Sequence, residues 1–230
     1  YSRRGNSMKL NGIDAVLLGR EEIKKLVPML DFSENVRFPI FGGLLQPSGG
    51  TARHDAVAWG YARGADAMGV DIIQNCEVKG IKRNGDRVEG IETTRGFIKT
   101  KKIGVVAAGH SSVIANMVDL KLPLESKPLQ ALVSEPVKPI IDTVVMSNAV
   151  HAYVSQSDKG ELVIGAGTDA YVSYTQRGSH DVVEGTLKAI LELYPIFSRM
   201  KMLRQWGGIV DICPDASPII SKTHIKGLYF

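Results

Sequence analysis

The sequence contains little cysteine and no long apolar segment. Only two cysteines, Cys76 and Cys213, occur in 230 residues, and they form no CxxC spacing. This pattern predicts neither a disulfide framework nor a zinc cluster, and it favours a reducing, cytoplasmic location. No apolar run approaches the length that spans a bilayer, so we expect no membrane segment.

The sequence also has only a small excess of positive over negative charge. Lys and Arg together number 28 against 24 Asp and Glu, which gives a net charge of +4 and a pI near 9.0. Such a mildly basic balance does not predict a nucleic-acid-binding protein. A hydrophobic content of 44% is ordinary for a globular chain and excludes the collagenous, coiled-coil and disordered classes. The length predicts one or two domains with a substantial core.

The two ends lack the usual marks of chain termini. The sequence opens at Tyr1 without an initiator Met or a signal peptide, and it stops at Phe230 inside a strand-like run. We therefore expect an internal piece of a longer chain. The absence of a motif that belongs near a terminus then carries little weight.

The first half of the sequence predicts helices followed by short strands. An amphipathic helix is expected over residues 19–27, and an Ala-rich helix over 51–68 that ends at Gly69. Hairpin turns are expected at Asn84-Gly85 and Arg95-Gly96. The strands are expected over residues 70–78, 88–93, 96–100 and 103–108.

The second half predicts longer alternating strands and one helix. The strands are expected over residues 130–135, 143–146, 149–156, 161–165 and 201–212, and the helix over 181–194. A sheet covered by a helix is typical of an α+β domain. The fold class is therefore α/β with α+β character: part of one α/β domain at 49–122 and a second domain at 123–218.

A glycine motif follows one of these strands. Residues 165–170, GAGTDA, match the G-x-G-x-x-G/A pattern of dinucleotide-binding loops. The residues after it are β-branched and aromatic and do not open a helix that could hold a pyrophosphate. We interpret the motif as the glycine-containing end of a strand.

Small residues also follow the apolar run at 105–108. They allow either tight strand-to-helix packing or close approach of a nucleotide, and the sequence leaves both open. Ser111 and Ser112 come next and are suited to cap a helix.

Histidines provide the other candidates for chemistry. His54 lies in the first turn of the helix at 51–68, beside Arg53, where an anion would be favoured. From the residues alone, an exposed capping histidine is the simpler interpretation. His151 and Tyr153 alternate on one expected strand and share either a pocket wall or a solvated face. No histidine or cysteine spacing suggests a metal site.

The segment GGTARHDAVAWGYA, residues 49–62, resembles the β-subunit family of heterotetrameric sarcosine oxidases. That family is a branch of the D-amino-acid-oxidase-like, FAD-dependent oxidoreductases. The resemblance runs from about residue 36 to the end. Weaker support comes from residues 77–81, 105–112, 206–208, 211 and 214–218, which match the wider flavin oxidoreductase family.

The resemblance implies two flavins. It makes His54 the attachment site of a covalent FMN, with Arg53 as a phosphate or ring partner, while FAD binds noncovalently. It places Val78 at the FAD adenine. The segment beside the ADP moiety then consists of Ala107, Ala108 and Gly109.

The resemblance also implies a substrate site and an activity. His151, Tyr153 and Thr168 match the wall of the substrate cavity and are the candidate catalytic residues. The implied reaction is oxidative demethylation of sarcosine, or a similar N-methyl amino acid, to glycine, with electrons passing from FAD to FMN to oxygen. The implied partners are α, γ and δ subunits.

The implied fold is a glutathione-reductase-like flavoprotein. It combines an incomplete, Rossmann-like FAD-binding domain with a substrate domain built on an antiparallel or mixed sheet. The expected ranges are 1–48 for a connecting segment, 49–122 for FAD binding, 123–218 for the substrate domain and 219–230 for the return to the FAD-binding domain. The segments that hold the FAD pyrophosphate and meet the flavin ring would lie outside residues 1–230, so this piece alone is expected to be inactive.

Two alternatives stay open. One is a single-flavin amine or amino-acid oxidase or dehydrogenase, similar to glycine oxidase or dimethylglycine dehydrogenase, in which His54 has no covalent role. The other is a noncatalytic assembly subunit. Binding to nucleic acid or membrane is expected in neither case.

Overall fold

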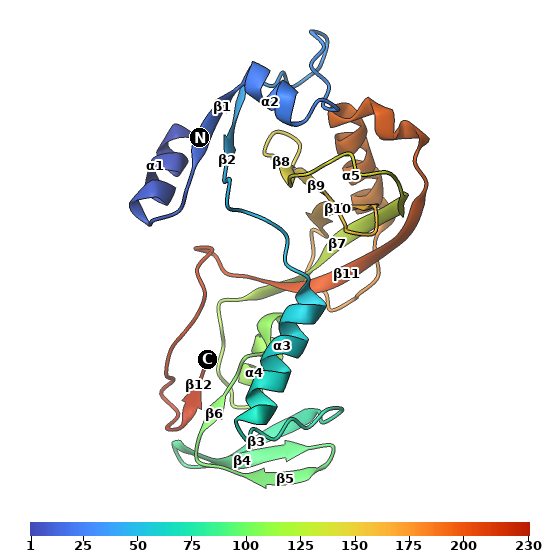
Figure 1. Cartoon of the computed structure of the whole chain (residues 1–230). Helices are drawn as coiled ribbons and strands as arrows, with labels where there is room; N and C mark the ends of the chain where they lie inside the picture. Colours follow the sequence, from blue (N-terminus) through green and yellow to red (C-terminus); the bar gives the residue numbers. More distant parts are fainter. The chain divides into compact units, whose positions relative to one another are not determined.

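The computed structural model describes residues 1–230 apart from the side chain of Ala166. The chain forms two compact units (Figure 1). The first unit comprises residues 1–52, 129–168 and 177–207, and the second comprises 53–128, 169–176 and 208–230. No helix among the described residues is long and apolar enough to cross a bilayer.

A five-stranded sheet organises the first unit, with strand order β11-β7-β10-β9-β8. Strands β7, β10, β9 and β8 pair antiparallel in that order. Residues 129–136 of β7 and 202–207 of β11 belong to this unit. The strands are β7 (Glu125–Pro136), β8 (Val145–Ser147), β9 (Ala152–Gln156), β10 (Glu161–Thr168) and β11 (Met202–Ile212).

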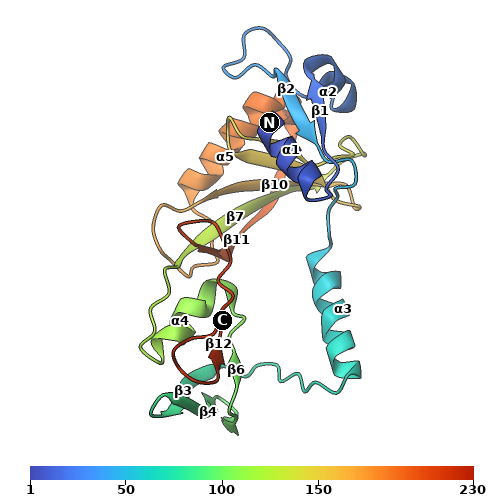
Figure 2. The same ribbon diagram turned by 90° about the vertical axis from the view of Figure 1, so that its left-hand side faces the viewer.

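One face of this sheet is covered by α5 (His180–Leu193), as Figure 2 shows. The register aligns four apolar side chains across neighbouring strands on that face: Leu132, Ile164, Val154 and Val145. Leu132, Ile164 and Val154 belong to one core cluster with Ile190 of α5, and Val145 packs against that cluster. The 3-10 helix η2 (Pro195–Arg199) closes the end of α5 by stacking Phe197 on Tyr194 at 4.7 Å between ring centroids.

A hairpin and two short helices complete the first unit. Strands β1 (Val16–Gly19) and β2 (Gly42–Leu45) pair antiparallel, preceded by α1 (Ser2–Leu10) and separated by α2 (Arg20–Leu26). The Glu22 carboxylate accepts a hydrogen bond from the Gly19 backbone N–H at 2.7 Å, which closes the first turn of α2. The Arg37 guanidinium contacts the Glu192 carboxylate of α5 through two nitrogens, at 3.2 and 2.8 Å.

The second unit combines a long helix, a three-stranded antiparallel sheet of order β3-β4-β5 and a parallel strand pair. Its small core holds Val88, Val105, Val118, Ile225 and Leu228. The elements are α3 (His54–Ala67), β3 (Val78–Asn84), β4 (Arg87–Thr93), β5 (Gly96–Lys99), β6 (Ile103–Gly104), η1 (Ala108–His110), α4 (Ser111–Asn116) and β12 (Leu228–Tyr229). The parallel pair is β6 with β12.

The mixed α/β class predicted from the sequence is confirmed. Helices α3 and α5 lie where the pattern indicates, and the two hairpins turn within one residue of the predicted dipeptides. The strand over residues 79–84, which forms most of β3, was not predicted. The assignment of residues 1–48, 49–122, 123–218 and 219–230 to cofactor and substrate domains stays a prediction. Residues 169–176 and 208–218 pack in the second unit.

Several predicted elements were wrong. The strand expected over 70–78 is absent, and β3 begins only at Val78. Val70, Ile72 and Ile73 are each about half exposed, because no neighbouring strand pairs with this segment among the described residues. The strand expected over 103–108 ends at Gly104. Helix α1 and the β1–β2 hairpin were not foreseen, since β1 and β2 are short and far apart in sequence.

Candidate functional site

The sequence predicted His54 in the first turn of a helix that starts at residue 51; α3 instead begins at His54 itself, with Arg53 as its N-cap. Both side chains are exposed. The Arg53 guanidinium contacts the Asp55 carboxylate at 3.1 Å, and this hydrogen bond lowers the pKa of Asp55. No hydrogen bond of the His54 imidazole is found among the residues that the structure describes. The imidazole is therefore open to a group that attaches to it.

Helix α3 carries none of its own residues into a core. Trp59 is 57% exposed and Tyr61 is 80% exposed. The larger apolar side chains of α3, among them Trp59 and Tyr61, make up the face that a helix usually buries. In the second unit taken by itself, that apolar face lies open.

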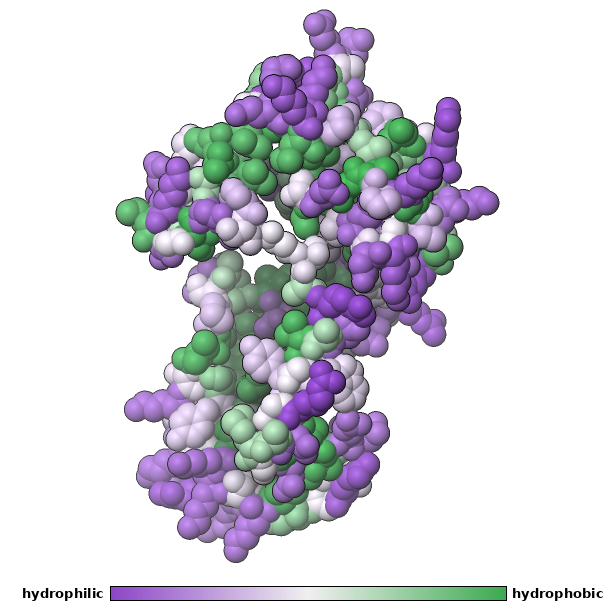
Figure 3. All heavy atoms as spheres, viewed as in Figure 1, coloured by the Kyte–Doolittle hydropathy of each residue, from purple (hydrophilic) through white to green (hydrophobic). Residues whose placement is uncertain are grey.

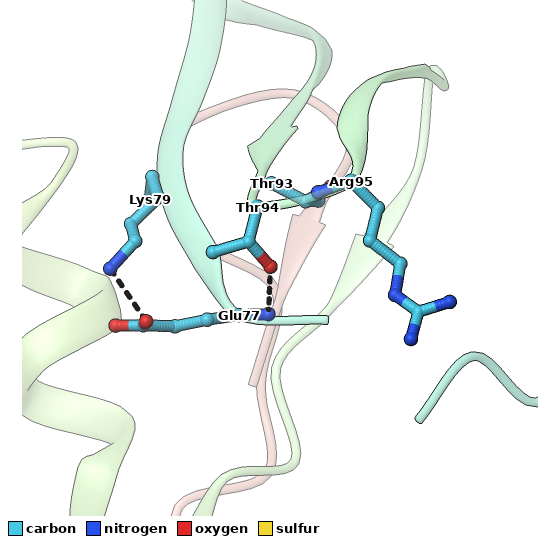
Figure 4. Close-up of polar contacts among 5 residues, drawn as sticks. All are labelled: Glu77, Lys79, Thr93, Thr94 and Arg95. Atoms are coloured by element: carbon cyan, nitrogen blue, oxygen red, sulfur yellow. Dashed lines mark hydrogen bonds and ion pairs between the residues drawn. The ribbon is translucent and has the colours of Figure 1, made fainter. Parts of the chain in front are cut away.

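Val78 begins β3 and is held by its flanking residues (Figure 4). The Glu77 backbone N–H donates to the Thr94 hydroxyl at 3.0 Å, and the Thr94 N–H donates to the Glu77 carbonyl at 2.9 Å. The Lys79 ammonium contacts the Glu77 carboxylate at 2.5 Å. Arg95 donates from Nε to the Asn75 carbonyl at 3.2 Å. The backbone of Val78 is thus fixed on both sides while its side chain is half-buried.

The segment with Ala107, Ala108 and Gly109 is not a continued strand. Ala108 has a φ of 44° and opens η1. Gly109 is buried, and a Cβ at this position would lie 2.4 Å from Cγ2 of Ile209. Its carbonyl accepts a hydrogen bond from the Ser126 hydroxyl. Packing therefore requires the glycine at 109, whereas Ala107 and Ala108 remain partly or fully exposed.

The surface beside this segment is open. A Cβ on Gly104 would meet no atom within 4 Å, and the Val106 side chain is 98% exposed. Ser111 lies inside α4 rather than capping it, because His110 occupies the N-cap position and makes no side-chain cap hydrogen bond. The backbone around residues 104–108 can consequently be approached closely by a planar group.

His151 and Tyr153 do not share a strand face, contrary to the sequence interpretation. His151 lies in the turn before β9 with a φ of 52°, and it is exposed. Tyr153 lies within β9 and is 37% exposed. The alternation of a strand does not extend through a left-handed turn residue, so the two side chains take unrelated directions.

Residues 165–168 of the glycine motif form the end of β10, as interpreted, and no helix directly follows the last two residues of the motif. The register against β7 shifts between Gly165 and Thr168, which marks a β-bulge or irregularity. Thr168 is half-buried and pairs with Leu129. Gly165 pairs with Tyr153 on β9 and Ala131 on β7. The sequence analysis did not predict that Gly165 lies opposite the aromatic Tyr153, because this pairing depends on the strand register.

Two carboxylates have pKa values set by short polar contacts. The Ser48 hydroxyl and backbone N–H donate to Asp14 at 2.6 and 2.9 Å, and the hydroxyl contact chiefly lowers the pKa of Asp14. The second carboxylate is that of Asp215. A hydrogen bond between Asp215 and the Cys213 thiol lowers the pKa of Asp215 and raises the pKa of Cys213. Asp14 therefore ties the segment that leads toward residues 49–54 to the start of β1.

The first unit also contains an apolar cavity of about 790 Å³. It lies among α1, α2, the β1–β2 hairpin and residues 143–149. Figure 3 shows hydrophobic side chains gathered at the visible surface around this hairpin. No group of three or more His, Cys, Asp or Glu side chains that could hold a metal ion occurs in the part of the chain that the structure describes.

The structure thus places the candidate residues in two groups. Tyr153 and Thr168 lie on neighbouring strands of the first unit. The candidates for flavin contact lie in the second unit: Arg53, His54, Val78, Ala107, Ala108 and Gly109.

Comparisons with known proteins match nearly the whole chain. The family described as FAD dependent oxidoreductase matches residues 2–230. Sarcosine oxidase subunit beta of Rhizobium meliloti (strain 1021) is 58% identical over 229 residues, which are 100% of this chain and 55% of that protein. The subunit of the same name from an Arthrobacter species is 52% identical over 99% of this chain and 56% of that protein. The chain thus spans just over half the length of these relatives.

Solved structures share the fold. L-proline dehydrogenase from P. horikoshii superposes with a TM-score of 0.89 at 25% identity, over 99% of this chain and 61% of that one. Glycine oxidase from Geobacillus kaustophilus superposes with a TM-score of 0.84 at 19% identity, over 99% of this chain and 60% of that one.

Proposed function

The chain belongs to the FAD dependent oxidoreductase family, and from this premise we propose that the protein oxidises sarcosine or a closely similar N-methyl amino acid. The observation that carries the proposal is the 58% identity to a sarcosine oxidase subunit beta over the whole chain. Bound flavin would supply the redox chemistry as the acceptor of a hydride equivalent from the N-methyl carbon of the substrate. The resulting iminium is hydrolysed to glycine and formaldehyde.

FAD is proposed to bind noncovalently along the second unit. The residues present fit part of it: the backbone of Val78 is fixed and half-buried, and the surface around Gly104 and Val106 is open. Val78 would contact the adenine, and Ala107 and Ala108 would lie beside the ADP moiety. Gly109 contributes by letting η1 pack against Ile209.

FMN is proposed to be attached covalently to His54. The exposed imidazole at the first residue of α3 fits this role, since a phosphate near it would meet the helix N-terminus. Arg53 would add a guanidinium contact to the phosphate, in exchange for its present contact with Asp55. Electrons would then pass from FAD to FMN and on to oxygen.

The substrate is proposed to bind over the open face of the first unit's sheet. Tyr153 is partly exposed there, and Thr168 follows the irregularity in β10. His151 is exposed in the neighbouring turn and is proposed to tune the proton on the substrate amine, because an imidazole can both accept and donate a proton. The proposed partners are α, γ and δ subunits, and the proposed location is the cytoplasm.

The test is made on the full-length protein co-expressed with its partner subunits. The protein is precipitated with acid, digested, and the peptide containing His54 is examined for flavin absorbance and the mass of FMN. The proposal expects the FMN adduct in the wild type and in H224A, a control at another exposed histidine of the second unit. It expects complete loss of the adduct in H54A.

Other outcomes would replace the proposal. Release of all flavin as free FAD would favour the single-flavin amine oxidase. A protein with no flavin of either kind, although its partner subunits are present, would favour the noncatalytic assembly subunit.

A further inference from the structure

One row of side chains crosses the open face of the first unit's sheet. The register aligns Ala131 of β7, Gly165 of β10, Tyr153 of β9 and Met146 of β8. Their neighbours along the strands, Leu132, Ile164, Val154 and Val145, lie on the face that α5 covers. Successive residues of a strand point to opposite faces. Met146 is 52% exposed and Tyr153 is 37% exposed. This row therefore forms a partly apolar shelf on the face opposite α5.

The Tyr153 ring lies directly over the backbone of Gly165. A Cβ built on Gly165 would lie 1.6 Å from Cε1 of Tyr153, 2.0 Å from Cζ and 2.2 Å from Cδ1. These distances are far inside any van der Waals contact, so the ring occupies the space that a side chain at 165 would need. Any residue other than glycine must lift the ring away from β10.

The neighbouring glycine of the same strand shows no such constraint. A Cβ on Gly167 would meet no atom within 4 Å. Both glycines lie in β10, and neither has the positive φ that would by itself require glycine. Positions 165 and 167 differ in the contact with the Tyr153 ring and in exposure, since Gly165 is buried and Gly167 is exposed. Gly167 is therefore the control for an added Cβ in β10 that meets no ring.

The irregularity in β10 lies beside this contact. The register against β7 shifts between Gly165 and Thr168, and such bulges redirect the side chains that follow them. Thr168 is half-buried and pairs with Leu129, which is 45% exposed. The open face thus carries the Tyr153 ring on β9, Thr168 on β10 and Leu129 on β7, which are neighbouring strands.

We propose that Gly165 is a positioning residue that holds the Tyr153 ring flat against β10, and that the pair sets the size of the N-alkyl group that the site accepts. This inference rests on the proposed function, in which the substrate binds over this face. With the ring flat, the space above it admits small secondary amines such as N-methyl amino acids. A lifted ring reduces that space, and removal of the ring deepens it.

The test uses the flavin-loaded holoenzyme with its partner subunits, and N-methylglycine and N-ethylglycine as substrates. We expect G165A to raise KM for N-methylglycine about tenfold while kcat changes by less than about threefold, because the ring blocks binding rather than the chemical step. The control G167A keeps the wild-type KM. Y153A shifts the ratio of kcat/KM for N-ethylglycine over N-methylglycine about tenfold toward N-ethylglycine, whereas Y153F keeps the wild-type ratio.

A stability measurement separates the contact from the substrate effect. G165A lowers Tm by roughly 5 °C because the overpacked ring must move. The double variant G165A/Y153A recovers Tm to the value of Y153A alone and keeps the Y153A substrate ratio. If Gly165 had only a structural role, G165A would lower Tm but leave both KM and kcat for N-methylglycine unchanged.

The outcomes that overturn the inference are distinct from those that overturn the proposed function. A wild-type enzyme whose flavin is reduced by neither amine contradicts the proposed function. A wild-type enzyme that turns over normally, with G165A equal to G167A in KM or with an unchanged substrate ratio in Y153A, contradicts the Gly165–Tyr153 inference alone.

Discussion

The two units of the chain differ in how they bury their apolar residues. In the first unit, strands β7, β9 and β10 and helix α5 share one core, in which Leu162, Val154 and Ile190 are at most 1% exposed. In the second unit, the core lies beneath β4, β6 and β12, while α3 buries none of its residues. A regular element can thus be formed in the chain without contributing to its core.

The contrast has a physical origin in the two helices. Helix α5 places Ala189, Ile190 and Leu193 on one buried face, so hydrophobic burial stabilises it. Helix α3 is rich in alanine, which favours helix formation by itself, and its larger apolar residues remain exposed. The first unit should therefore dominate the measured stability of residues 1–230.

The largest effect is expected from a substitution in the core of the first unit. Leu162 is fully buried on β10, and L162A should lower the free energy of unfolding by about 3 kcal/mol through lost burial and a residual cavity. Urea denaturation of residues 1–230 followed by circular dichroism measures this change. The control L129A, at a residue 45% exposed, should stay within about 0.5 kcal/mol of the wild type. Equal effects of the two variants would contradict the assignment of the core.

A second effect concerns a buried polar contact of the same unit. The Gln130 amide oxygen accepts hydrogen bonds from the Ser179 N–H at 2.9 Å and from Gln205 Nε2 at 2.8 Å. Gln130 is 1% exposed, so Q130A removes a buried acceptor from the half-buried Ser179 N–H and from the exposed Gln205 side chain. We expect a loss of about 2 kcal/mol in urea denaturation. The control Q74A, at an exposed glutamine of the second unit, should change little; a comparable loss there would contradict the role of this contact.

A smaller effect depends on pH. The Ser48 hydroxyl lowers the pKa of Asp14 below its ordinary value of 3.8, so the folded state favours the ionised carboxyl. The stabilisation is complete above the unfolded-state pKa and is lost as the pH falls through the lowered folded-state pKa. We expect wild type and D14N to differ in Tm near pH 6 and to converge as the pH is lowered below about 3.

The variant S48A serves as the partner control for this pH effect. It removes the hydroxyl donor and keeps the backbone N–H donor of residue 48, so it should reduce the Tm difference that D14N makes near pH 6. A difference between wild type and D14N that persists unchanged at low pH would contradict the contribution of this contact.

The smallest expected effect sharpens the comparison between the units. Trp59 of α3 is 57% exposed, and W59A in residues 1–230 should change the free energy of unfolding by no more than about 0.5 kcal/mol. Hydrogen exchange should show weak protection along α3 compared with α5, because no residue of α3 is buried. A loss as large as that of L162A would show that α3 belongs to a core of its own.

The sequence pattern was sufficient where structure is decided locally. The helices at 54–67 and 180–193 depend on neighbouring residues, and their prediction was confirmed. The two hairpin turns lie within one residue of the predicted dipeptides Asn84-Gly85 and Arg95-Gly96. The strand predicted over 70–78 failed because apolar alternation becomes a strand only when a partner strand lies beside it. His151 was misplaced for a related reason, since a turn residue with positive φ interrupts the alternation.

The sequence by itself determined the class of elements, the flavoprotein resemblance and the identity of the candidate residues, because these depend on local pattern and on motifs read directly from the chain. Only the tertiary structure decided that Tyr153 lies over Gly165, that Gly109 packs on Ile209 and that α3 stays open. These contacts join residues far apart in sequence, and strand register and packing, rather than residue type, bring them together.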